Sequence, residues 1–200
     1  MSAGDSPDRG DVGKYLQFVN DKQNSLVLAN WFFLLGVIST VGALPGFYQV
    51  LRKEGVLVAI AIWAMAIGLV LDVAFFAANL GIAYKLAPGY ASAVEASKLA
   101  LGVVASTISI IATLEDAVGD AFFCGIGLAL FAYASLKTNF VPKWAGWMGL
   151  LGSLVTGWVG AFSSLAHFLE LVVLIGFVPF FIWFVIMGIR LVRAKKPATT

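Results

Sequence analysis

The sequence predicts an all-α, polytopic membrane protein with six transmembrane helices in one bundle and both termini in the cytoplasm. Hydrophobic residues make up 60% of the 200 residues and charged residues only 12%, whereas about 25% of residues are charged in an average soluble domain. Several apolar runs are long enough to cross the roughly 30 Å of hydrocarbon in a bilayer. Too few polar residues remain between the runs for a soluble domain, so we expect one membrane domain over residues 25–192.

Small residues recur at every fourth position in the fifth apolar run, which is a further sign of helix packing in a bilayer. They are Ala145, Gly149, Ser153, Gly157 and Ala161, called the seam below. On a helix these positions share one face, against which another helix can pack closely. A second ladder of small residues lies in the fourth run, at Ala117, Ala121, Gly125 and Ala129. The sequence predicts that the seam packs on this ladder, and leaves open that it binds another protein.

Residues 1–24 are expected to form a cytoplasmic N-terminal segment. Asp5 and Asp8 make its start acidic, unlike the basic start of a secretory signal, so we expect no cleaved targeting segment. Between Asp11 and Lys22, apolar residues share one helical face, which predicts a short helix on the membrane surface.

The six spans are expected at about 25–51, 56–84, 98–114, 117–136, 144–166 and 168–192, followed by a basic tail at 193–200. Pro45 and Pro179 lie inside the first and sixth spans and are expected to bend them. The acidic pair Glu115 and Asp116 separates the third span from the fourth. Short connections of this kind predict antiparallel hairpins for the third and fourth spans and for the fifth and sixth.

The distribution of basic residues predicts the orientation of the six spans. Most Lys and Arg residues fall in the segments on the side of the two termini, while Arg52 and Lys53 fall on the other side. The positive-inside rule then places both termini in the cytoplasm.

Asp72 lies near the middle of the second span, and Asn79 is close to the same helical face. An ionised aspartate at the bilayer centre costs about 2.5 to 3.5 kcal/mol, so Asp72 is expected to face the bundle interior, protonated or with a polar partner. Ser106 and Ser109 in the third span are candidate partners. These residues predict a proton or ligand site, with a structural hydrogen bond between helices as the alternative.

Acidic residues and the single histidine gather at the outer ends of the predicted spans. This outer cluster consists of Glu115, Asp116, Asp120, His167 and Glu170. Carboxylate and imidazole groups in such an arrangement are typical of a cation, metal or proton site. The alternative is that these carboxylates cap helix N-termini at the membrane surface. Whether a metal binds stays open, and no catalytic residue or cofactor is identified.

Several short motifs carry a resemblance to a known group of proteins. They are Leu44-Pro45-Gly46, Phe131-Ala132-Tyr133, Val141-Pro142-Lys143-Trp144 and Gly188-Ile189-Arg190. Together they resemble an uncharacterised family of small six-helix bacterial membrane proteins, a domain of unknown function. The resemblance implies the architecture and the bacterial inner membrane, and it supplies no catalytic residues.

Two classes of function follow from the sequence. The favoured one is a non-catalytic membrane module that binds lipid, a small apolar molecule, a partner membrane protein or a second copy. The alternative is a proton- or cation-coupled transporter, or a membrane enzyme, that uses Asp72 and the outer cluster. A net charge of +2 gives no indication of nucleic acid binding.

Overall fold

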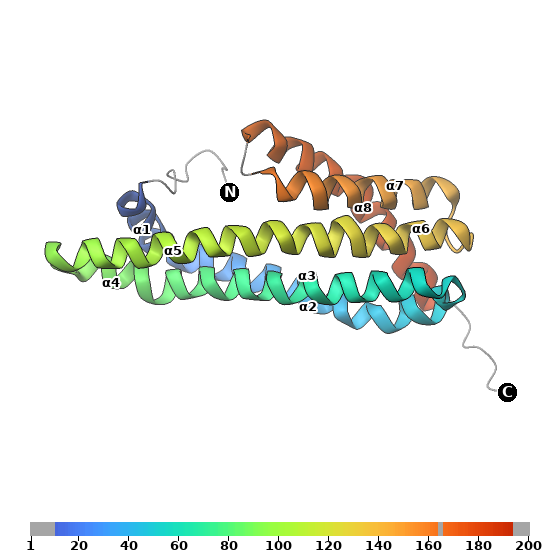
Figure 1. The fold of residues 1–200 in the computed structure, drawn as a ribbon, viewed down its shortest axis with the longest axis horizontal. Coiled ribbons are helices and arrows are strands. Elements are labelled where there is room, and N and C mark those ends of the chain that lie inside the picture. Colours follow the sequence, from blue (N-terminus) through green and yellow to red (C-terminus); the bar gives the residue numbers. More distant parts are fainter. Residues whose placement is uncertain (1–10, 164–165, 194–200) are drawn as a thin grey trace. The chain divides into compact units, whose positions relative to one another are not determined.

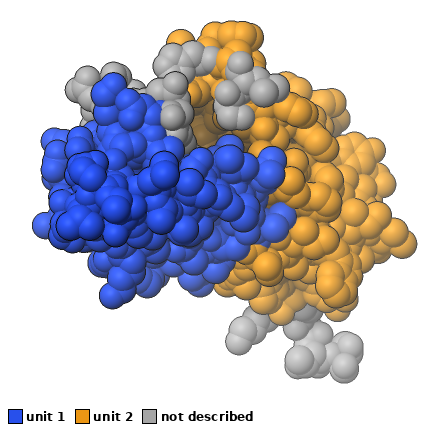
Figure 2. All heavy atoms as spheres, turned by 60° about the vertical axis from the view of Figure 1, so that its left-hand side comes forward, with its two compact units in different colours: residues 1–38, 71–116 blue, residues 39–70, 117–200 orange. Residues whose placement is uncertain are grey.

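The computed structural model describes residues 11–163 and 166–193, and these residues form helices with no strand among them (Figure 1). The chain divides into two compact units, which Figure 2 colours separately. Unit 1 comprises residues 1–38 and 71–116, and unit 2 comprises residues 39–70 and 117–200. The all-helical class predicted from the sequence is therefore confirmed for the described residues.

Most of the described chain is α-helical. The α-helices are α1 (Val12–Asp21), α2 (Gln23–Leu51), α3 (Val56–Gly81), α4 (Ala87–Ser92), α5 (Glu95–Asp120), α6 (Ala129–Lys137), α7 (Lys143–Leu154) and α8 (His167–Arg193). A 3-10 turn, η1 (Arg52–Glu54), joins α2 to α3. Three π-helical segments extend neighbouring helices, namely η2 (Ile82–Leu86), η3 (Ala121–Leu128) and η4 (Val155–Val159).

Four helical stretches in the described residues are long and apolar enough to cross a membrane. They are Gln23–Glu54, Val56–Ser92, Glu95–Lys137 and Phe168–Arg193. Their length and composition support a membrane-embedded protein, but the count of six spans is not confirmed. The third and fourth predicted spans form one helical stretch of 43 residues, without the hairpin expected between them.

The expected turn at Glu115 and Asp116 is absent for a local reason. Neither residue breaks a helix, and Glu and Asp in a helix interior are unfavourable by no more than about 0.7 kcal/mol each relative to Ala. Glycine and proline, which favour turns, do not occur between Thr113 and Val118. The stretch ends only at Lys137, before Asn139 with its positive φ of 52° and Pro142.

Unit 1 contains a small apolar core built from α1, η2, α4 and part of α5. Its buried residues are Leu16, Val19, Ile82, Ala83, Ala87 and Ala105. Asp11 caps α1 by accepting a hydrogen bond from the backbone N–H of Lys14 at 3.2 Å, and the Lys14 side chain bonds the same carboxylate at 2.8 Å. This hydrogen bond from the Lys14 side chain lowers the pKa of Asp11. The Gln23 amide donates to the Ala83 carbonyl at 2.8 Å and ties the start of α2 to η2.

The core of unit 2 is centred on Trp183 in α8. Trp183 is fully buried, and its ring lies nearly parallel to that of Phe47 at a centroid distance of 6.4 Å. Phe47 also stacks on Phe131 at 4.9 Å. The Trp183 indole N–H donates to the Ser135 hydroxyl at 3.4 Å. Side chains from α2, α6 and α8 therefore meet in one aromatic cluster inside unit 2.

The helices α7 and α8 pack as an antiparallel pair within unit 2. A Cβ at Gly149 would contact the Trp183 ring, and a Cβ at Gly152 would lie 2.7 Å from the backbone nitrogen of Phe180. Further along, Gly176 faces Val155. The contacting positions run in opposite order on the two helices, so the chain reverses between them.

Candidate functional site

Asp72 is buried in unit 1, with 6% of its surface exposed. Its carboxyl is close enough to that of Asp116 on α5 for the two to interact electrostatically. The sequence predicts two separate sites for these residues, whereas their carboxyl groups interact electrostatically in the structure. Two carboxyl groups in partly apolar surroundings repel one another when both are ionised.

Of the polar residues expected to partner Asp72, one bonds its own helix and two lie on α5. The Asn79 amide donates to the Phe75 carbonyl of its own helix at 2.9 Å. Ser109 is buried and Ser106 is half-buried, both on α5. No described hydrogen bond joins these three side chains to Asp72, so a polar site that includes them stays a prediction.

The outer cluster is only partly described. Glu170 lies in the first turn of α8, where a carboxylate interacts favourably with the helix N-terminus. Asp116 and Asp120 lie inside a continuous helix, so the alternative that they cap a helix N-terminus is wrong. The side chain of His167 is outside the described residues. Among the residues described, no group of three or more His, Cys, Asp or Glu side chains is placed to hold a metal.

Two π-helical segments cross in unit 2 at a pair of glycines. A Cβ at Gly157 in η4 would overlap the backbone of Gly125 in η3, and a Cβ at Gly160 would lie 3.0 Å from Oδ2 of Asp120. Nearby in α7, the hydroxyl of Ser153 is buried and has no hydrogen-bond partner among the described residues. In this structure the seam therefore packs within its own chain at Gly157. Such π segments often occur at functional sites, and no pattern in the sequence predicted them.

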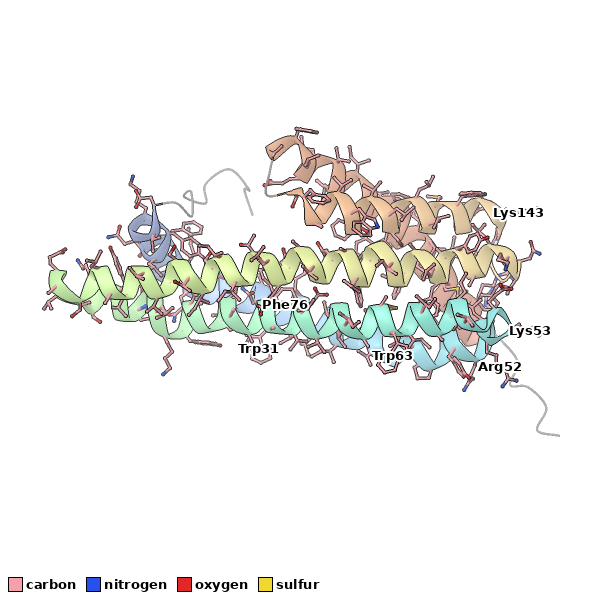
Figure 3. The ribbon with its side chains drawn as sticks, viewed as in Figure 1. Trp31, Arg52, Lys53, Trp63, Phe76 and Lys143 are labelled. Atoms are coloured by element: carbon pink, nitrogen blue, oxygen red, sulfur yellow. The ribbon has the colours of Figure 1, made fainter. Side chains whose placement is uncertain are left out.

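Basic residues gather at one end of unit 2. They are Arg52, Lys53, Lys137, Lys143, Arg190 and Arg193, called the basic end below. Figure 3 shows Arg52, Lys53 and Lys143 at this end. Glu54 forms an ion pair with Lys137 at 2.7 Å, which joins the turn after α2 to the end of α6. The six-span orientation placed Glu54 and Lys137 on opposite sides of the membrane, and this ion pair shows that placement to be wrong.

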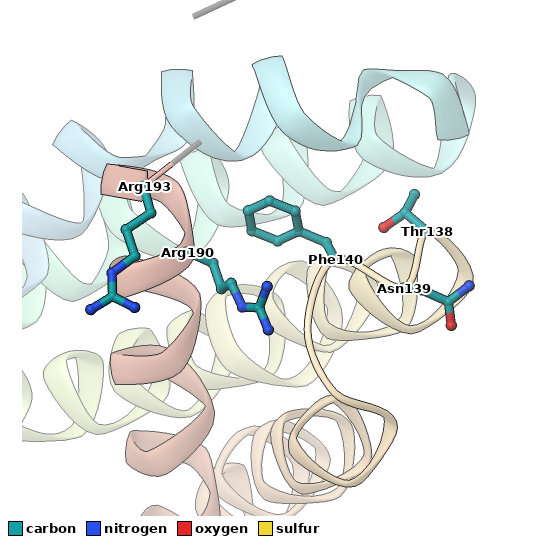
Figure 4. Close-up of a pocket in the computed structure, with 5 residues that line it drawn as sticks. All are labelled: Thr138, Asn139, Phe140, Arg190 and Arg193. Atoms are coloured by element: carbon teal, nitrogen blue, oxygen red, sulfur yellow. The ribbon is translucent and has the colours of Figure 1, made fainter. Parts of the chain in front are cut away.

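A pocket of about 550 Å³ opens at the basic end (Figure 4). It is lined by Thr138, Asn139, Phe140, Arg190 and Arg193. This pocket was not predicted from the sequence, in which the segment after α6 and the end of α8 look only like basic flanks of the spans. The available signal was the pair of arginines three residues apart at the end of α8.

The loop that forms one wall of the pocket has a defined backbone geometry. Asn139 has a left-handed φ of 52°. Its N–H donates to the Leu136 carbonyl at 3.2 Å, and the Phe140 N–H donates to the Ser135 carbonyl at 3.1 Å. These two bonds form a Schellman motif, in which the left-handed residue satisfies the last carbonyls of the helix.

A family model for a domain of unknown function, DUF4386, matches residues 5–194. The chain belongs to the DUF4386 family. The match covers both units, so they are parts of one DUF4386 domain. The resemblance to an uncharacterised family, seen in the sequence motifs, is confirmed. Comparison with curated proteins and with solved structures gives no match.

Proposed function

We propose that this DUF4386 protein is a non-catalytic membrane module that binds anionic lipid at the basic end of unit 2. The observation that carries the proposal is the convergence of cations from three separate parts of the chain. Arg52 and Lys53 follow α2, Lys137 and Lys143 flank the loop after α6, and the arginines end α8. Each Lys or Arg near an anionic membrane surface contributes about 1 kcal/mol to its attraction.

Tryptophans near the basic end support a position at the membrane surface. Trp144 and Trp147 lie in the first turns of α7, next to Lys143, and are 56% and 54% exposed. Tryptophan is enriched where the hydrocarbon meets the headgroups, because its ring is apolar and its N–H is polar. The converging cations and the exposed tryptophans therefore both favour contact with lipid headgroups. Binding of a partner membrane protein or a second copy stays a prediction.

Lipid binding is tested on the purified full chain in a mild detergent, with phosphatidylglycerol as the anionic lipid and phosphatidylcholine of the same acyl chains as the zwitterionic one. We expect native mass spectrometry to show preferential binding of phosphatidylglycerol. The triple variant Arg52→Gln, Lys53→Gln, Lys143→Gln is expected to weaken this binding by up to about 3 kcal/mol, at about 1 kcal/mol for each cation. None of these three residues lines the pocket.

The matched control removes cations from unit 1, through Lys22→Gln and Lys85→Gln. It should retain the preference for phosphatidylglycerol. Equal binding of the two lipids by the unmodified protein, or an equal loss in the control, would contradict the proposal.

A proton- or cation-coupled transporter is a second candidate, supported by the buried position of Asp72 and its interaction with Asp116. A carboxyl pair of this kind is suited to hold and release a proton. Under this candidate, Asp72→Asn should leave folding intact and abolish proton flux, because the amide has a similar shape and cannot exchange the proton. Flux is measured in proteoliposomes with an enclosed pH-sensitive dye. Absence of flux in the unmodified protein, or unchanged flux in Asp72→Asn, would exclude a proton-coupled role for Asp72.

A further inference from the structure

We propose that the pocket at the basic end is a binding site for one phosphate group, carried by a phospholipid headgroup or by a free phosphate. The proposal deepens the proposed function, on which it rests for a lipid as the source of the phosphate. The pocket lies between the loop Thr138–Phe140 and the last turn of α8.

The pocket carries positive charge. Arg190 and Arg193 line the pocket, and no carboxylate is among the residues that line it. Neither arginine forms an ion pair with a described residue. A guanidinium is always charged and presents several N–H donors in a plane, which match the oxygens of a phosphate. Two unpaired arginines three residues apart therefore favour an anion with several acceptor oxygens.

The wall opposite the arginines has a backbone fixed by hydrogen bonds. The Schellman motif holds Asn139 in a left-handed conformation, and the Thr138 hydroxyl donates to the Ala134 carbonyl at 2.9 Å. The Asn139 side chain is thus attached to a loop whose backbone hydrogen bonds are already formed without a ligand. Its amide can donate hydrogen bonds to a phosphate oxygen. The loop backbone that carries this donor is ordered before binding, so binding does not have to order it.

The pocket also has an apolar side and the volume of a small-molecule site. Phe140 is half-buried and packs against the core of unit 2. In Figure 4 the Arg190 guanidinium extends from α8 toward the loop, beside the Phe140 ring. The volume of about 550 Å³ lies within the roughly 300–1,000 Å³ of typical small-molecule sites. The pocket therefore offers an apolar wall next to cationic and amide donors, which suits a phosphate attached to an organic group.

A different role for the arginines gives a different expectation. Basic residues in the last turn of a helix interact favourably with its unpaired carbonyl groups, with no ligand involved. In that case replacing Arg190 would lower the stability of α8 and leave phosphate binding unaffected. The two roles are therefore separated by measuring ligand affinity together with thermal stability in the absence of ligand.

The experiment measures dissociation constants for the full chain in detergent at constant ionic strength, with three probes. They are short-chain phosphatidylglycerol, inorganic phosphate and a diacylglycerol of the same acyl length, which lacks phosphate. Arg190→Gln is expected to weaken binding of the phosphate-bearing probes by about 10- to 100-fold, because it removes a charge-assisted interaction. Asn139→Gly is expected to weaken it by about 2- to 10-fold, because it removes only the amide.

The Asn139→Gly variant keeps the loop, because glycine is the residue most common at this position of a Schellman motif. Lys22→Gln is the control, since Lys22 is an exposed cation of unit 1 that neither belongs to the basic end nor lines the pocket. We expect this control to change affinity for inorganic phosphate by less than about 2-fold, as an exposed charge outside the pocket is screened by salt.

Competition between the probes identifies the source of the phosphate. Displacement of phosphatidylglycerol by inorganic phosphate would show a site for the phosphate group from either source. Binding of phosphatidylglycerol alone would show a lipid site, and binding of inorganic phosphate alone a site for free phosphate. Each of these outcomes supports the proposal only if Arg190→Gln weakens the binding. Unchanged affinities in Arg190→Gln, or diacylglycerol binding as tight as that of phosphatidylglycerol, would overturn it.

Failure of this proposal is distinguishable from failure of the proposed function. If the triple variant loses its preference for phosphatidylglycerol while Arg190→Gln and Asn139→Gly bind phosphatidylglycerol and inorganic phosphate as tightly as the unmodified protein, the basic end binds lipid without a phosphate pocket. If inorganic phosphate binds through Arg190 and phosphatidylglycerol shows no preference, the pocket stands and lipid binding fails.

Discussion

Replacing Gly157 with alanine is expected to disrupt the packing of unit 2. The added methyl group would overlap the backbone of Gly125 and lie 2.9 Å from the carbonyl oxygen of Asp120. Backbone atoms cannot rotate away as a flexible side chain can, so the two π segments would have to separate. We expect a loss of stability at or above the upper end of the roughly 1–3 kcal/mol typical of overpacking. Thermal unfolding in detergent, followed by fluorescence-detected size exclusion, measures the loss.

Gly188→Ala is the matched control for this substitution. Gly188 lies in α8 within the same unit, and nothing is within 4 Å of the position that its Cβ would take. Alanine favours a helix interior over glycine by about 1 kcal/mol, so the control should be as stable as the unmodified protein or more stable. If Gly157→Ala unfolds at the same temperature as Gly188→Ala, the close crossing of η3 and η4 is wrong.

Trp183→Ala is expected to be the most destabilising truncation among the aromatic residues of unit 2. Trp183 is fully buried, contacts Phe47 and Phe180, and donates its N–H to Ser135. Removing a buried tryptophan leaves a cavity and lowers stability by about 3–5 kcal/mol in soluble proteins. Between membrane helices the transfer part of this loss is smaller, because lipid also solvates apolar groups. We therefore expect about 3 kcal/mol, measured by the same thermal assay.

Trp63→Ala serves as the comparison, because Trp63 also belongs to unit 2 and is 71% exposed. Its truncation leaves no internal cavity and should change stability by less than about 0.5 kcal/mol. Similar losses for the two tryptophans would show that the aromatic cluster around Trp183 does not hold unit 2 together. Trp183→Phe should fall between them, since it keeps a ring and loses the hydrogen bond to Ser135.

The fold class follows from composition and pattern, because these report on single helices. An excess of apolar residues and the lack of strand signals predicted helices of membrane-crossing length, which the described residues contain. The connection between helices was harder to predict. Glu115 and Asp116 look like a polar turn in the sequence, but a helix passes through them, since no residue nearby prevents it.

The candidate sites were harder still, because they depend on contacts between distant segments. Asp72 has Asp116 as its electrostatic neighbour, and helical spacing alone did not identify this pair. The pocket requires a left-handed Asn139 and the approach of α8 to the loop after α6. Neither feature produces a periodic pattern in the sequence. The basic residues around the pocket were therefore interpreted only from their charge.

The continuous helical stretch from Glu95 to Lys137 gives the acidic pair a different meaning. At about 1.5 Å per residue, 43 residues span roughly 65 Å, about twice the hydrocarbon thickness of a bilayer. About 20 helical residues are needed to cross that hydrocarbon. Asp116 lies about this number of residues before Lys137. The acidic pair therefore lies about one crossing length before Lys137 on the same helical stretch. The same two residues that look like a turn in the sequence thus divide a helical stretch of about two crossing lengths into two halves, one in each compact unit.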